Sequence, residues 1–162
     1  MIKMIAACDL NRTIGKDNKL IWNLKSDIEY FKSKTLHQTI VMGYNTYQSL
    51  GKPLPNRENV VLSRQDRDLP KGVKLYHNVE EVLEAYKDKD IWICGGEQIY
   101  EQFLPYADQI YLTIVVAALR GGDTFFPEIS LEEWKCTRRH KKDADEYNEY
   151  NHWYCLYEKL GV

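Results

Sequence analysis

Short apolar runs alternate with helical patterns through the first two-thirds of the chain, and this alternation restricts the fold more than any other feature of the sequence. Runs typical of strands cover residues 2–8, 39–43, 59–63, 73–76, 91–94 and 109–116. Segments with helical periodicity lie between them, at residues 25–34, 45–50, 80–86 and 97–104. Because parallel strands need long crossover connections, usually helices, this order predicts an α/β fold with a mainly parallel sheet.

The last third of the chain has a different pattern. Residues 134–141 and 150–159 are typical of two strands of an antiparallel hairpin, with the polar segment 143–146 near the turn. We find no repeat, low-complexity stretch or linker. A length of 162 residues is therefore expected to form one domain over residues 1–162.

Composition excludes several classes of protein. A net charge of −2 gives no general attraction to nucleic acid or to anionic membranes. The apolar run at residues 1–8 is too short for a signal peptide, and nothing approaches the length of a membrane span. The four cysteines form no CxxC pair and the four histidines show no pairing pattern, so we expect reduced structural thiols, no metal site, no catalytic histidine and a cytoplasmic protein.

The helical segment after residue 24 carries a carboxylate among apolar side chains. Leu24, Ile28 and Phe31 share one helical face, and Asp27 lies within that stripe, with no Lys or Arg in helical reach on that face. Burial there would raise the pKa of Asp27 and make it a candidate acid or base. Asp27 could instead lie at the edge of the stripe or cap a nearby loop, and Ser26 is a candidate helix cap.

Two strands are followed by glycine and then by a helix. One ends in Gly95 and Gly96, and the other ends in Gly43 ahead of Asn45 and Thr46. Such turns expose backbone N–H groups that can bind a phosphate, and neighbouring turns at one sheet edge could hold one extended ligand. Both turns could also be plain strand-to-helix connections, with Asn45 or Thr46 as a helix cap.

Two arginines are candidates for anion binding. Arg57 follows a turn made rigid by Pro53 and Pro55, which suits a guanidinium that grips a carboxylate with two hydrogen bonds. Arg64 stands beside Ser63 at a strand end and could hold a phosphate. Either arginine could equally be a solvated surface charge.

Taken in order, these motifs and their neighbours resemble bacterial dihydrofolate reductase over the whole chain. The matching stretches are 9–15, 20–24, Asp27 with Phe31 and Lys32, 41–43, 53–57, 95–100, 111–113, 122–127 and 143–146. The resemblance implies a single-domain α/β fold with a predominantly parallel sheet of about eight strands, four flanking helices and an antiparallel C-terminal hairpin. It also implies hydride transfer from NADPH to C6 of 7,8-dihydrofolate, with protonation at N5.

The resemblance further implies roles for individual residues on the substrate side. Asp27 would hydrogen-bond N3 and the 2-amino group of the pterin and polarise the ring while a water delivers the proton. Arg57 would bind the glutamate α-carboxylate. The catalytic residues implied are Asp27, Trp22, Tyr100 and Thr113, and the substrate-binding residues are Ile5, Ala6, Asp27, Ile28, Phe31, Leu50, Lys52, Leu54, Arg57, Cys94 and Thr113.

On the cofactor side, the resemblance implies that the pyrophosphate lies at the two glycine turns and that the Gly95–Gly96 peptide is cis. Residues 11–23 would form a lid over the nicotinamide. The cofactor-binding residues implied are Ala7, Ile14, Gly15, Asn18, Leu20, Gly43, Tyr44, Asn45, Thr46, Leu62, Ser63, Arg64, Gly95, Gly96, Glu97, Gln98, Ile99, Tyr100 and Gln102.

The chain departs from the family pattern at several positions. Ile21 stands where a proline is common, so we expect altered lid kinetics and weaker binding of diaminopyrimidine antifolates such as trimethoprim. Tyr44 replaces an arginine that often contacts the adenosine phosphate, and Arg64 would compensate and keep the preference for NADPH. Glu97 replaces a small residue and is expected to point to solvent. The loop at residues 114–122 is apolar where acidic groups are usual, which leaves its coupling to the lid open.

Two other functions remain compatible with the sequence. One is a related pterin or pyrimidine reductase of the same fold, and the other is a non-catalytic protein that binds folate or a nucleotide. The presence of both Asp27 and Arg57, which match the two ends of folate, favours dihydrofolate reductase. By resemblance we also expect a monomer.

Overall fold

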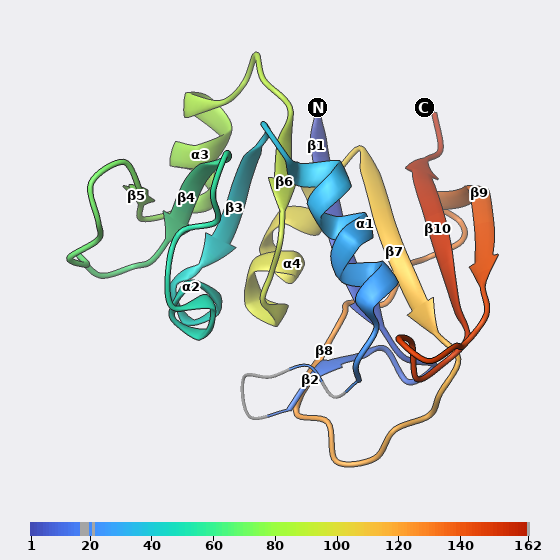
Figure 1. The fold of residues 1–162 in the computed structure, drawn as a ribbon. Coiled ribbons are helices and arrows are strands. Elements are labelled where there is room, and N and C mark those ends of the chain that lie inside the picture. The colour runs from blue at the N-terminus through green and yellow to red at the C-terminus, as the bar shows by residue number, and fades with distance from the viewer. Residues whose placement is uncertain (17–19, 21, 162) are drawn as a thin grey trace.

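A computed structural model shows an eight-stranded sheet with helices on both faces (Figure 1). The structure describes residues 1–16, 20 and 22–161. The strand order is β5-β4-β3-β6-β1-β7-β10-β9. The strands are β1 (Ile2–Cys8), β3 (Thr39–Gly43), β4 (Glu58–Leu62), β5 (Lys74–Tyr76), β6 (Ile91–Ile93), β7 (Gln109–Val115), β9 (Trp134–Lys142) and β10 (His152–Lys159).

Six neighbouring strands are parallel, and the last two are antiparallel. Strands β5, β4, β3, β6, β1 and β7 pair in parallel, whereas β10 pairs antiparallel with both β7 and β9. The predicted α/β class, parallel sheet and C-terminal hairpin are therefore confirmed. Each predicted strand is present, with ends that differ by at most two residues.

The helices cover the sheet as two pairs. Helices α3 (Val79–Ala85) and α4 (Glu97–Phe103) pack against one face, in a core that contains Val41 and Ile93. Helices α1 (Lys25–Thr35) and α2 (Tyr44–Leu50) pack against the other face, in a core that contains Ile40 and Met42. Successive residues of β3 thus enter opposite cores, as the pleat of a strand requires. Among the described residues, no helix is long and apolar enough to cross a membrane.

A second, two-stranded sheet was not predicted. It pairs β2 (Thr13–Gly15) with β8 (Thr124–Phe125) at the lower end of the molecule in Figure 1. Both strands are shorter than the four residues at which alternation becomes detectable. After α4 the chain continues as a 3₁₀ turn, Leu104–Tyr106, which contains Pro105.

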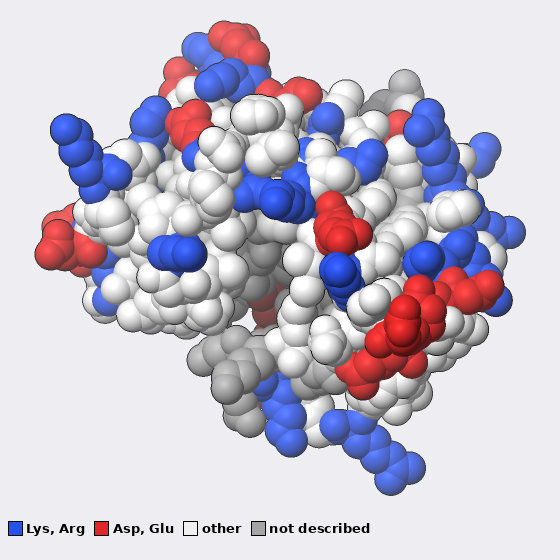
Figure 2. Space-filling view, in the orientation of Figure 1, with Lys and Arg blue, Asp and Glu red and all other residues white. Residues whose placement is uncertain are grey.

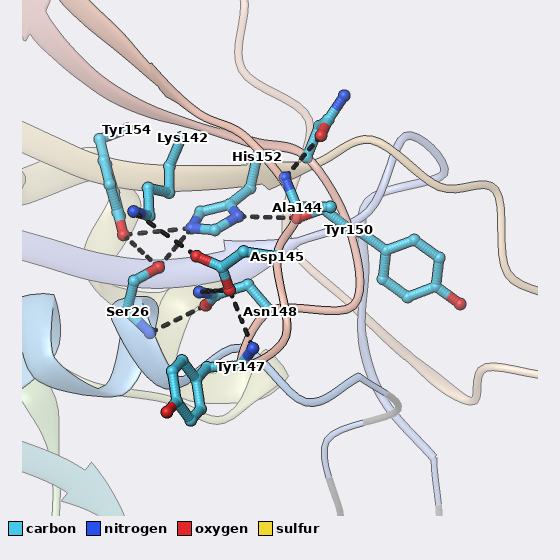
Figure 3. Close-up of polar contacts among 10 residues, drawn as sticks. Ser26, Lys142, Ala144, Asp145, Tyr147, Asn148, Tyr150, His152 and Tyr154 are labelled. Atoms are coloured by element: carbon cyan, nitrogen blue, oxygen red, sulfur yellow. Dashed lines mark hydrogen bonds and ion pairs between the residues drawn. The ribbon is translucent and has the colours of Figure 1, made fainter.

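The start of α1 is held by a loop that lies far away in the sequence. The prediction that Ser26 caps this helix is wrong, because the N-cap residue is Leu24 and its side chain makes no capping hydrogen bond. Instead, Asn148 Oδ1 accepts a hydrogen bond of 2.9 Å from the Ser26 N–H (Figure 3), and the Tyr147 carbonyl accepts one from the Lys25 N–H. Asn148 is 4% exposed, so its amide acts as a buried cap.

We predict that Asn148→Ala lowers the free energy of unfolding by about 1–2 kcal/mol, because the first turn of α1 loses the acceptor for an otherwise unpaired N–H group. Urea unfolding measures this change. Asn23→Ala is the matched control, since the Asn23 side-chain amide makes no hydrogen bond with the described residues. Equal stability of the two variants would show that Asn148 does not cap the helix.

Candidate active site

The candidate site lies where the carboxyl ends of the parallel strands meet. The ends of β3 and β6 touch there, because the Gly43 N–H donates a hydrogen bond of 2.8 Å to the Gly95 carbonyl. Figure 2 shows the face of the molecule hollowed near its centre, between α1 and α2 as drawn in Figure 1. Ligands of open α/β sheets bind at this edge, so the predicted location agrees with the fold.

Asp27 lies in the first turn of α1 and faces β7. The Thr113 hydroxyl donates a hydrogen bond of 2.7 Å to Asp27 Oδ1. Burial raises the pKa of Asp27, while the Thr113 hydrogen bond and the proximity of His152 oppose that rise. The expectation of a carboxylate with a raised pKa and without a lysine or arginine partner is therefore supported by the geometry.

The apolar stripe around Asp27 differs from the prediction. Leu24 is buried and Phe31 is half-buried, but Ile28 is 58% exposed. The side of α1 that meets the sheet carries Tyr30 and Thr35 instead. Asp27 is itself half-buried and follows the buried Leu24 by three residues, so its carboxylate is still able to reach a ligand.

Arg57 is fixed by a turn that depends on a buried asparagine. The Asn59 side chain accepts from the Leu54 N–H and donates to the carbonyls of Leu54 and Arg57. The Arg57 guanidinium donates through Nε to Thr35 Oγ1 at 2.9 Å and through Nη1 to the Pro55 carbonyl at 3.0 Å. The described hydrogen bonds do not use Nη2, so this nitrogen is able to donate to an anion.

Three glycines allow β3, β6 and α4 to approach closely. A Cβ atom on Gly43 would lie 2.9 Å from Ile99 Cγ1, and one on Gly95 would lie 3.1 Å from the Tyr100 ring. Gly95 has a φ of +111°, and the Gly95–Gly96 peptide is cis as predicted. Tyr100 is buried and its hydroxyl donates a hydrogen bond of 2.7 Å to the Ile5 carbonyl, which ties α4 to β1.

A basic residue that the sequence analysis did not select lies beside Tyr44. The Arg67 guanidinium stacks 4.1 Å from the centre of the Tyr44 ring, and its Nε donates to Ser63 Oγ at 3.1 Å. The predicted candidate, Arg64, is exposed. The position four residues after Ser63 was the only sequence signal for Arg67, and loop residues have no fixed periodicity from which to infer contact.

The base of the predicted lid is held by a buried carboxylate. Asp9, which is 1% exposed, accepts hydrogen bonds from the N–H groups of Asn11 and Thr13 and from that of Leu119. The Asp9 carboxylate therefore connects the predicted lid to the loop at residues 114–122, which contributes the backbone N–H of Leu119 and no acidic side chain. Two lid predictions, on Asn18 and Ile21, lie outside the described residues.

Glu97 does not point to solvent as predicted. Its Oε1 accepts a hydrogen bond of 3.1 Å from the Phe125 N–H, which links α4 to the small β2–β8 sheet. Its carboxylate is thus directed toward β8.

The remaining predicted residues divide by exposure. Buried or half-buried are Ile5, Ala6, Ala7, Ile14, Gly15, Trp22, Thr46, Leu54, Leu62, Cys94, Gly96 and Ile99. Exposed are Leu20, Asn45, Leu50, Lys52, Gln98 and Gln102. The described residues contain no cluster of three or more His, Cys, Asp or Glu side chains that could hold a metal ion.

Comparison with known proteins identifies the relatives of this chain. The family described as "Dihydrofolate reductase" matches residues 1–159. The chain is 37% identical to the dihydrofolate reductase of Staphylococcus haemolyticus, over 98% of this chain and 96% of that protein. It is 40% identical to the enzyme of Haemophilus influenzae, over 91% and 92% of the two chains.

A solved structure shows the same fold. It is dihydrofolate reductase from Enterococcus faecalis complexed with NADP(H) and RAB-propyl, which superposes with a TM-score of 0.93. Its sequence is 36% identical, and the match covers 99% of this chain and 97% of that one.

The raised pKa of Asp27 predicts an effect on stability. A carboxyl with a raised pKa in the folded state costs no stability below its ordinary pKa of 3.8, and it destabilises the fold progressively as pH rises through the folded pKa. We expect Asp27→Asn to be more stable than the parent chain at neutral pH, with the difference vanishing in acid. Urea unfolding as a function of pH measures it.

Glu58→Gln is a control for which we expect a change in stability of the opposite sign. Burial of Glu58 is outweighed by hydrogen bonds from Tyr86 and Lys74, which lower the pKa of Glu58 from 4.5 to about 2. This variant should be less stable than the parent chain at neutral pH, and its deficit should disappear as pH falls through about 2. If both variants changed stability in the same direction, the interpretation of Asp27 would be wrong.

Proposed function

This chain belongs to the dihydrofolate reductase family and has dihydrofolate reductase activity, and we propose which of its residues bind the substrate and which bind NADPH. The observation that carries the proposal is the half-buried carboxyl of Asp27, held by Thr113 and lacking a lysine or arginine partner among the described residues. Loss of NADPH absorbance that depends on dihydrofolate tests the activity, and no turnover by folded protein would contradict it.

Asp27 is proposed to bind and polarise the pterin. An ionised carboxylate with Oδ1 fixed by Thr113 can accept hydrogen bonds from N3 and the 2-amino group of the ring, a donor pair that matches two carboxylate oxygens. This favours protonation of the ring at N5, with the proton delivered by water. Trp22, which is buried against Leu24 and Val115, is proposed to help position that water.

The other end of dihydrofolate carries a carboxylate, for which Arg57 is the proposed partner. Two of its donors are already used to fix the guanidinium, so the side chain loses little conformational entropy when it binds an anion. Ile5, Ile28, Phe31, Leu50 and Leu54 are proposed to enclose the ring system between the two charged ends. The exposure of Ile28 is consistent with this role, because its apolar surface is uncovered in the free chain.

The residues at the glycine edge fit NADPH, which supplies the hydride for C6 when it is bound. Gly43, Gly95 and Gly96 leave a stretch of backbone without side chains, against which a pyrophosphate can lie. Ala7 and Ile14 are proposed to contact the nicotinamide amide through their backbones. Tyr100 is proposed to fix the position of β1 relative to α4 through its hydrogen bond to the Ile5 carbonyl.

The 2′-phosphate of NADPH is proposed to bind near Tyr44. The Arg67 guanidinium is held flat on the Tyr44 ring and beside Ser63, where a doubly charged phosphate can meet both a cation and a hydroxyl. Arg64, on the same strand end, is proposed to add a second positive charge. Together the two arginines replace the charge that the family usually carries at position 44.

We further propose that residues 1–162 work as one domain, as a monomer and in the cytoplasm. The four cysteines are free thiols, in keeping with a reducing compartment. Antifolate inhibitors are proposed as ligands of the Asp27 site, since one solved relative is complexed with RAB-propyl.

We predict that Asp27→Asn slows dihydrofolate reduction by roughly 100-fold or more at neutral pH, because the pterin loses its anionic partner. The loss should be smaller at low pH, where the substrate arrives already protonated. Steady-state kcat/KM as a function of pH measures this. Asp88→Asn, the same change on an exposed turn, is the control, and a pH-independent loss at Asp27 would contradict the proposed role.

We predict that Arg67→Ala lowers kcat/KM for NADPH by roughly tenfold, equivalent to about 1.4 kcal/mol, and leaves kcat/KM for NADH unchanged. Arg64→Ala should also erode the preference for NADPH. Arg138→Ala on β9 is the matched control. An unchanged ratio between the two cofactors in both the Arg64 and Arg67 variants would show that the 2′-phosphate binds elsewhere.

A further inference from the structure

A buried histidine lies behind the proposed substrate site, at a position for which the sequence analysis predicts no role. His152 on β10 is 0% exposed. Its Nε2 lies 2.8 Å from Ser26 Oγ and 3.1 Å from the Tyr154 hydroxyl, and its Nδ1 lies 3.0 Å from the Tyr150 carbonyl (Figure 3). Three side chains, from α1 and β10, thus form one hydrogen-bonded cluster.

The partners determine how the imidazole is oriented. The Tyr150 carbonyl can only accept, so Nδ1 carries a hydrogen and donates it. The Tyr154 hydroxyl donates to Ser26 Oγ at 3.0 Å, and Nε2 of the ring lies 2.8 Å from the same oxygen. Each polar atom of the cluster is therefore satisfied, and the ring is held in a single orientation.

The cluster adjoins Asp27 on two sides. Ser26 precedes Asp27 in α1, and Tyr154 lies opposite Thr113 in the β7–β10 ladder. Thr113 is the residue that donates to Asp27. One turn along α1, Tyr30 stacks on Tyr154 with ring centres 4.3 Å apart. Strand β10 therefore holds α1 immediately before Asp27, through Ser26, and about one turn after it, through Tyr30.

We propose that His152 is a positioning residue for dihydrofolate reduction, which acts through Ser26 and Tyr154 to hold the Asp27 carboxyl against Thr113 and supplies a polar ring on its protein side. The inference rests on the proposed role of Asp27 and goes beyond it, because His152 itself does not touch the substrate.

The charged and titratable groups around the cluster are few. From β9, Lys142 is the ladder partner of His152 and forms an ion pair of 3.7 Å with Asp145. From α1, Glu29 lies near Tyr154. Asp27 itself is faced by Tyr30, Tyr154 and, from α4, Tyr100. The described side chains that favour the ionised form of Asp27 are Thr113, through its hydrogen bond, and His152, through its electrostatic interaction.

The sign of the expected effect follows from this arrangement. Burial raises the pKa of Asp27, and His152 opposes that rise. Replacing the ring by an apolar side chain removes the opposing interaction, so the pKa of Asp27 rises further and less of the carboxyl is ionised near neutral pH. The pterin then meets a weaker acceptor, whereas the NADPH site at the glycine edge is unaffected.

The test compares His152→Leu, His152→Gln and Ser26→Ala with the parent enzyme and with His140→Gln, a control on the exposed face of β9. Single-turnover loss of NADPH absorbance with dihydrofolate is followed from about pH 5 to about pH 9. We expect His152→Leu and Ser26→Ala to move the apparent pKa of hydride transfer upward by about half a pH unit or more. The KM for dihydrofolate should rise roughly threefold and that for NADPH should stay constant.

His152→Gln keeps an acceptor near the place of Nε2, so a smaller shift in this variant is the expected partial rescue. An unmoved pH profile and an unmoved KM, even with a lowered Tm, would show that the cluster only fastens α1 and would overturn the proposal. If His152→Leu does not fold, Ser26→Ala and His152→Gln decide between these outcomes. Failure of Asp27→Asn to show its predicted pH dependence would instead contradict the proposed function, so the two failures are distinguishable.

Discussion

The parallel pairing of β1 with β6 on one side and with β7 on the other decides where the chemical groups of the site lie. Because these strands run in the same direction, the residues that follow them emerge at one edge of the sheet. Thr113 stands beside Ala7 in this register, and the Ile5 carbonyl is left within reach of the Tyr100 hydroxyl. The proposed substrate and cofactor sites are thus neighbours before any loop is considered.

The sheet and helix α1 together set the pKa of a single carboxyl, that of Asp27. Burial at the border of the core favours the neutral acid, while Thr113 and His152 favour the ionised form. The two influences that favour ionisation come from different strands, β7 and β10, and both act on the first turn of α1. Because these effects oppose one another, the pKa of Asp27 responds to small changes in the packing of α1 on the sheet. The way in which α1 is attached to the sheet therefore affects the chemistry of the site as well as the stability of the fold.

Much of the fold could be predicted because it is encoded locally. The apolar runs of β1, β3 and β7 and the glycine turns are visible in short windows, and each was found close to its observed position. Asp27 and Arg57 could be selected because a carboxylate in an apolar stripe and an arginine after two prolines are local anomalies. The family resemblance then supplied the roles that periodicity alone left open.

Other parts of the site could not be predicted because they depend on contacts between distant segments. The cap of α1 comes from Asn148, 122 residues after Ser26, so a local rule selected the wrong residue. Ile28 fits a helical stripe but faces outward, because the packing of Tyr30 on Tyr154 sets the rotation of α1. The dependence of α1 on the 143–151 loop also has a consequence for synthesis on the ribosome. The helix emerges early, but its cap, Thr113 and His152 follow more than 80 residues later. The nascent chain therefore exposes the Asp27 carboxyl long before the groups that position it have been synthesised. The candidate site is complete only when the last strands have left the ribosome.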